Sequence, residues 1–250
     1  MKKILSLIIA LSLLMTLMLV SCKKESAESL VRDAVEKYKT HSTLQDETKS
    51  EMVISANGVE LEMTIENKAT IKNNGSDDFM MHLVTTTTVM GEKNVSEGFY
   101  TNGYIYYVEN GVGIKTAYSP NTDASLISLV EGLPSEAYEG VDIIKNKDGS
   151  KTVEFSLSSE QLGEMYTVMA ERFTDIMGLE ESYDIKVTDT VARITVAKGE
   201  ISKLELSYNT YATIDGTELS MRSNMESNVI SFSDDITVTM PEGYLDFPEV

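Results

Sequence analysis

The sequence predicts an α+β fold in which a large, curved antiparallel sheet of about ten or eleven strands, a half-barrel, wraps an N-terminal helix and a helix-hairpin-helix insertion. Three observations support this class. Apolar and polar residues alternate over many segments, which is typical of strands with one solvent-exposed face. Asn-Gly and Asp-Gly pairs, which favour tight hairpin turns, separate these segments. Amphipathic helical patterns interrupt the strands only near the N-terminus and in the middle of the chain.

The N-terminal helix is predicted over residues 27–41. Apolar residues recur there at spacings of three to four, and charged residues such as Arg32 and Glu36 lie between them. The apolar positions are Leu30, Val31, Ala34, Val35 and Tyr38. This helix is therefore expected to pack one side against the sheet.

Six strands are predicted to follow as a meander. The first two alternate clearly and are joined by a turn at Asn57-Gly58. A third strand, rich in threonine, covers residues 79–90. Shorter strands follow and carry the tyrosines of residues 100–107. Because tight turns join them, successive strands are expected to be neighbours in the sheet.

The insertion is predicted to contain a helix over residues 123–131, a hairpin that pairs residues 141–145 with 152–157, and a longer second helix. Ser158 and Gln161 have the spacing of a capping box, in which each side chain bonds the other's backbone at a helix start. This second helix is therefore expected to begin at Ser158.

Strands are predicted to resume at Tyr183. Period-two alternation then continues through Leu204, Leu206 and Tyr208. The same alternation over Ile236–Met240 predicts a last strand near the C-terminus.

The N-terminus predicts export and lipid anchoring. Lys2 and Lys3 precede an uncharged apolar run over residues 4–20, as in a secretory signal. The run leads into Leu-Val-Ser-Cys, which resembles a bacterial lipobox, and Cys22 is the only cysteine of the chain. The resemblance implies cleavage before Cys22, lipidation of its thiol and acylation of the new amino terminus.

An uncleaved membrane-spanning helix is the alternative for this segment. Its 17 uncharged residues are at the short limit for crossing a bilayer, which favours the signal. The predicted organisation is a signal peptide over residues 1–21, the lipidated cysteine with a short tether over residues 22–29, and a single domain over residues 30–250.

The charge of the chain excludes one class of partner. The formal net charge is −19, and loss of Lys2 and Lys3 with the signal lowers it to −21. Such a surface repels nucleic acid, whose binding needs clustered Lys and Arg. It also repels anionic lipid head groups, so membrane attachment is expected to depend on a diacylglyceryl or acyl anchor at Cys22.

Recognisable catalytic and metal-binding patterns do not occur. The sequence has no Gly-x-Ser-x-Gly and no His-Glu-x-x-His. Its two histidines, His41 and His82, are too few for a His-rich site, and His82 is expected on the solvent side of a strand. Paired acidic residues match no calcium loop. We therefore predict no enzyme, no metal and no cofactor.

The order of elements across residues 27–245 resembles the LolA/LppX-like lipoprotein family. That resemblance implies a half-open barrel that wraps its helices and holds a lipid or a lipoprotein acyl chain. Carriers of that family that move between membranes are not themselves lipidated. A lipid tether at Cys22 would therefore distinguish this protein from those carriers. Residues 98–107 are similar to part of uncharacterised Gram-positive lipoproteins, and Lys23 does not resemble the Gram-negative inner-membrane retention signal. These similarities favour an exported protein of a Gram-positive envelope.

Methionine use suggests a ligand. The chain has 14 methionines, many on predicted inward faces, and flexible thioethers suit a cavity for varied acyl chains, although they also fill ordinary cores. The predicted ligand-binding residues are Met52, Ile54, Leu61, Met63, Leu162, Met165, Met169, Phe173, Leu219 and Met221. A Met169→Asp substitution is expected to abolish lipid uptake while the sheet still folds.

Two functions remain open at this point. The first is a surface lipoprotein that sequesters or transfers a hydrophobic ligand, in particular a lipid. The second is a non-catalytic envelope scaffold or interaction protein with a filled core and no ligand. The sequence names no protein partner for either function.

Overall fold

The computed structural model describes residues 25–74, 76, 78–109, 112–117, 126–162, 164–177, 184–214 and 216–249. The predicted signal peptide, Cys22 and Tyr183 lie outside these residues. The strands are β1 (Thr43–Ala56), β2 (Val59–Lys72), β3 (Met80–Val89), β4 (Glu92–Thr101), β5 (Tyr104–Glu109), β6 (Val112–Ala117), β7 (Ile143–Lys145), β8 (Lys151–Leu157), β9 (Lys186–Ala197), β10 (Glu200–Ile214) and β11 (Thr217–Ser231).

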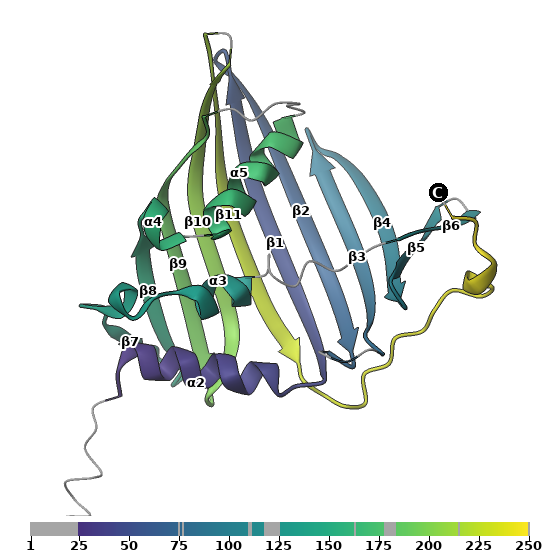
Figure 1. Cartoon of the computed structure of the whole chain (residues 1–250), viewed down its shortest axis with the longest axis horizontal. Coiled ribbons are helices and arrows are strands. Elements are labelled where there is room, and N and C mark those ends of the chain that lie inside the picture. The colour runs from purple at the N-terminus through teal and green to yellow at the C-terminus, as the bar shows by residue number, and fades with distance from the viewer. Residues whose placement is uncertain are drawn as a thin grey trace, which may run out of the picture.

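These eleven strands form one open, curved sheet (Figure 1). Its order is β6-β5-β4-β3-β2-β1-β11-β10-β9-β8-β7, and every neighbouring pair is antiparallel. The predicted six-strand meander is confirmed, since β1 to β6 are consecutive neighbours. At the first turn, Asn57 and Gly58 have φ angles of 51° and 78°, the left-handed values that a two-residue hairpin turn requires.

The helical segments are α2 (Ala27–Lys39), α3 (Leu126–Gly132), η2 (Ser135–Tyr138), α4 (Ser159–Leu162), α5 (Glu164–Met177) and η3 (Tyr244–Asp246). Ser26 caps α2, and its hydroxyl accepts a hydrogen bond from the Ser29 backbone. The capping box predicted before α4 is confirmed, because the Ser158 backbone donates to Gln161 Oε1 at 3.0 Å and the Gln161 backbone donates to Ser158 Oγ at 3.3 Å. None of the helices in the described part of the chain is long and apolar enough to cross a membrane.

Two predicted elements differ in the structure. The hairpin β7–β8 is no separate insertion, because β8 pairs along its length with β9 and extends the main sheet. Ile236–Met240 is not a strand. Both sides of β11, the strand that precedes it, are already paired, with β1 and with β10. The segment still buries Ile236 while Thr237 is exposed, so its alternation reflects one-sided packing without a strand partner.

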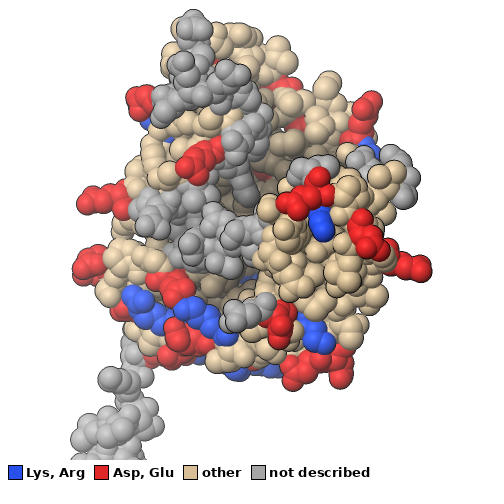
Figure 2. All heavy atoms as spheres, turned by 45° about the vertical axis from the view of Figure 1, so that its right-hand side comes forward, with Lys and Arg blue, Asp and Glu red and all other residues tan. Residues whose placement is uncertain are grey.

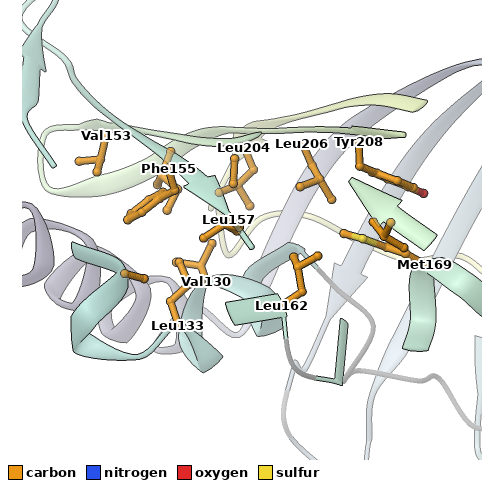
Figure 3. Close-up of a cluster of buried hydrophobic side chains, with 14 of the residues drawn as sticks. Val130, Leu133, Val153, Phe155, Leu157, Leu162, Met169, Leu204, Leu206 and Tyr208 are labelled. Atoms are coloured by element: carbon orange, nitrogen blue, oxygen red, sulfur yellow. The ribbon is translucent and has the colours of Figure 1, made fainter. Parts of the chain in front are cut away.

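The described helices cover one part of the sheet. Helix α2 packs against β9 and β10, α4 against β8, and α5 against β9 and β10, while η2 contacts α2 and β8. Buried side chains from these strands and helices meet in one apolar cluster (Figure 3). The labelled members are Val130, Leu133, Val153, Phe155, Leu157, Leu162, Met169, Leu204, Leu206 and Tyr208. This cluster fixes the helices over the β8–β10 side of the sheet.

We expect Phe155→Ala to lower the free energy of unfolding by about 3–5 kcal/mol, because it leaves a cavity in this cluster. The Phe155 side chain is 1% exposed and lies edge-on to Tyr138, with 5.1 Å between ring centroids. Val59→Ala, at a side chain that is 71% exposed, is the control and should change stability by less than about 0.5 kcal/mol. The free energies of unfolding are measured by urea denaturation. Equal decreases for Phe155→Ala and Val59→Ala would contradict this packing.

Candidate functional site

The candidate site is the inner face of the sheet, which we define as the face that carries Met52 and Ile54 and against which the helices pack. The register of β1 places Met52 opposite Met63 of β2, and Ile54 between Leu61 of β2 and Met221 of β11. Directly paired residues point to the same side of a sheet. The predicted strand residues are therefore brought together in the middle of the inner face.

The predicted helix residues join the same region. Leu162, Met169 and Phe173 belong to the apolar cluster that also contains Met52 and Ile54. The surroundings of the Met165 side chain lie outside what the structure describes. The ten predicted residues thus converge wherever the structure describes them.

Burial divides these residues into two groups. Met52, Ile54, Leu162, Met169, Phe173, Leu219 and Met221 are buried, whereas Leu61 and Met63 are half-buried. Met169 is only 3% exposed, so an aspartate there would place a charge in the packed core and unfold the protein. Met169→Asp is therefore not a usable test of ligand uptake, which corrects the expectation from sequence.

The accessible part of the inner face lies on β2 and β3. Leu61, Met63 and Ile65 are half-buried and pack against the core cluster from its edge. Every residue of β3 is half-buried as well. In Figure 1 the described helices lie in front of the β8–β11 side of the sheet, α5 also crosses in front of β1, and β3 and β4 lie outside that cover. The apolar core thus continues onto β2, beyond β8, β9 and β10, the strands against which the described helices mainly pack.

A row of polar side chains crosses this inner face. We call it the polar belt, and its members are Ser227, Thr48, Asn67, Thr85 and Ser96. Each is directly opposite the next, across β11, β1, β2, β3 and β4 in turn. Within the belt, Thr85 Oγ1 donates a hydrogen bond to Asn67 Oδ1 at 2.8 Å. Alternation within single strands does not predict the belt, although alternate positions of β1 change visibly from isoleucine and methionine to serine and threonine.

Asp46 lies beside the belt, two residues from Thr48 on the same face of β1. No described residue forms a hydrogen bond or an ion pair with its carboxylate. Burial raises the pKa of Asp46 to about 6. The pKa of the neighbouring Tyr38 hydroxyl is also raised, first by burial and then by the negative charge of Asp46. Asp46 is therefore a desolvated carboxylate without a described partner.

Positive charge lies on the opposite, outer face of these strands. Lys49, Lys68, Lys93 and Arg222 all have the outward register on β1, β2, β4 and β11. Lys68 pairs there with Glu47 at 2.7 Å. Figure 2 shows acidic side chains projecting around the outline of the molecule, with uncharged residues and some basic side chains between them. The described inner face of β1 to β4 and β11 contains no lysine or arginine.

Neither histidine belongs to the polar belt. His82 has the outward register on β3, as expected; its Nε2 is 2.7 Å from Glu97 Oε1, and its ring stacks on Phe99. His41 stacks on Phe232, 3.9 Å away, at the end of α2. Within the described ranges, no three His, Cys, Asp or Glu side chains form a group that could hold a metal ion.

A surface cleft of about 710 Å³ lies between the start of α2, η2 and β7. Its lining includes the acidic residues Glu25, Glu28, Glu139 and Asp142. Glu28 is already engaged by Arg32 and Ser135. The lining also includes the apolar residues Ala27, Val141 and Ile143, so the cleft is a mixed polar and apolar surface at the edge of the sheet.

Comparisons with known proteins show no matching family model and no matching curated protein. Among solved structures, the chain is similar to LprF from Mycobacterium bovis, with 14% identity and a TM-score of 0.41 over 87% of this chain and 97% of LprF. It is also similar to lipovitellin, in a structure concerned with lipid–protein interactions, with 9% identity and a TM-score of 0.35 over 80% of this chain and 26% of that one. At TM-scores this low, the similarities do not bear on function. Membership of the LolA/LppX-like family stays a prediction.

We expect Asp46→Asn to change how stability depends on pH. The folded-state pKa is raised above its unfolded value near 4, so the wild-type protein loses stability relative to this variant as pH rises from about 4 to about 6. Above that window, Asp46→Asn should be more stable by about 1–2 kcal/mol. Urea denaturation across this pH range measures the difference. A difference that does not vary with pH would contradict the burial of this carboxylate.

Proposed function

We propose that this protein binds a lipid or another hydrophobic ligand on the inner face of its sheet. One observation carries the proposal: the apolar core continues past the helices onto Leu61, Met63 and Ile65, which remain half-buried. Apolar side chains at the edge of a core favour a partner that removes them from water. The described strands supply a long surface of this kind, with β2 alone running from Val59 to Lys72.

The driving force is apolar burial, and no covalent chemistry is needed. Each methylene of a ligand that leaves water contributes about 0.8 kcal/mol. Met63, opposite Met52, places flexible thioethers at the edge of the covered region. Such side chains adapt to alkyl chains of different shape without a rigid pocket.

The proposal includes an anchor at Cys22 on the extracytoplasmic face of the cell membrane. Helix α2 begins at Ala27, so only four residues separate it from Cys22. A flexible linker of that length spans roughly 10 Å on average. The sheet would thus be held close to the bilayer, where it can exchange a lipid without travelling between membranes.

A scaffold with a filled core is the second candidate. Seven of the ten predicted ligand-binding side chains are buried by other parts of the protein, which leaves no room for a ligand at those positions. This alternative requires that the β2–β3 part of the inner face serves only for packing. Direct detection of a bound lipid separates the two candidates.

We expect native mass spectrometry of residues 23–250, expressed without the signal, to show an adduct of lipid mass that organic extraction removes. A bare protein mass that persists after incubation with a membrane lipid extract would contradict lipid binding. That outcome would favour the scaffold.

We expect the double variant Met63→Gln with Ile65→Gln to bind alkyl ligands at least about tenfold more weakly, because both polar side chains face the ligand. Displacement of a bound fluorescent probe measures the affinity. The matched control, Glu62→Gln with Thr64→Gln, changes the outer face of the same strand and should leave affinity unchanged. Equal affinities of the two double variants, both shown to be folded by thermal denaturation, would place the ligand elsewhere.

A further inference from the structure

We propose that the inner face selects an amphiphile whose head group is cationic or rich in hydroxyl donors, and that this head group binds at the polar belt beside Asp46. The inference rests on the proposed function, because it names the class of the ligand. It follows from the charges, the hydrogen-bonding groups and their place between apolar side chains.

The charges of the inner face exclude an anionic head group. On β1 to β4 and β11, the described inward positions carry no lysine or arginine, and Asp46 is the charged group next to the belt. Glu92, the other inward acid of these strands, lies at the start of β4. A phosphate, sulfate or carboxylate at the belt would therefore face a carboxylate and find no cation to neutralise it.

The basic residues in the last turn of α2 are engaged elsewhere. Lys37 Nζ is 2.9 Å from Glu200 Oε1, and Lys39 pairs with Glu131. The Tyr38 hydroxyl is near Asp46 but donates no hydrogen bond to it in the structure. Asp46 thus remains without an internal partner. A carboxylate that is desolvated but unpaired gains free energy from an ammonium or hydroxyl donor of a ligand.

The belt supplies further polar groups in one line. Asn67 Oδ1 accepts a hydrogen bond from Thr85, and the Asn67 amide nitrogen forms none with another described residue. Thr48, opposite Asn67, adds a hydroxyl that can donate or accept. A head group with several hydroxyls, or an ammonium, can therefore bond both Asp46 and the belt.

Apolar side chains flank the belt along the strands. Ile65 and Met63 lie on one side of Asn67 on β2, and Ala69 and Ile71 lie on the other. A head group at the belt therefore leaves its alkyl chain in contact with an apolar surface. The side with Met63 joins the core cluster, so the chain is expected to extend in that direction.

The test is competition between ligands that share one alkyl chain length and differ in their head groups. Residues 23–250, which retain every described element, are loaded with the fluorescent probe N-phenyl-1-naphthylamine at neutral pH. Dodecylamine, monolaurin and laurate are then compared below their micelle concentrations. We expect dodecylamine and monolaurin to displace the probe at concentrations about tenfold lower than laurate does.

The variant Asp46→Asn should reduce the advantage of dodecylamine over laurate by about fivefold or more. Glu47→Gln is the matched control, since it removes a neighbouring carboxylate on the outer face, and it should preserve the full advantage of dodecylamine over laurate. Thermal denaturation confirms that both variants are folded.

The outcomes separate this inference from the proposed function. Laurate binding as tightly as dodecylamine to the wild-type protein, or an undiminished advantage of dodecylamine in Asp46→Asn, overturns the head-group inference and leaves lipid binding intact. Failure of the probe and of all three ligands to bind overturns both proposals.

Discussion

The pairing register of β1 with its two neighbours is the constraint on which the rest of the structure depends. A strand has two faces, and a slip of one residue exchanges them completely. The observed register sets Met52 against Met63 on one side and Ser223 on the other. The same ladder, continued, sets Thr48 against Asn67 and Ser227. The core, the accessible apolar surface and the polar belt thus all follow from one strand register. A change in that register would move all three sets of side chains together.

The size of the sheet relative to its helices explains why part of the inner face stays accessible. Eleven described strands form the sheet, whereas the described helices pack mainly against β8, β9 and β10. On that side Ile194 and Phe155 are almost completely buried. On β2 and β3 the inward residues are half-buried, and polar groups are tolerated among them. Because the helices cover the sheet unevenly, part of its apolar inner face stays accessible, and Asp46 lies where it can bind the head group of a ligand.

Much of this fold could be predicted from local sequence patterns. The Asn57-Gly58 turn, the capping box at Ser158 and the alternation of β1 and β2 each specify structure within a few residues. The pairing of distant strands is harder to predict, because alternation assigns a side chain to one face of the sheet but does not determine which strand lies next to it. Hence alternation alone predicts an insertion at β7 and β8 and a strand at residues 236–240, whereas β8 extends the main sheet and residues 236–240 form no strand. For the site, alternation brought the inward methionines together, but only packing shows that Met169 is covered and Met63 is not. The polar belt depends on five strands in register, which no local pattern specifies.

Photo-crosslinking with a monoacylglycerol that carries a diazirine on its alkyl chain would test most directly whether the inner face binds a lipid. Peptide mapping by mass spectrometry then identifies the labelled residues. Our account predicts labels on the inward positions of β2 and β3, such as Met63, Ile65 and Leu83, and their loss when unlabelled lipid competes. Labels confined to outer-face positions such as Thr64, or labels that excess lipid does not remove, would contradict it.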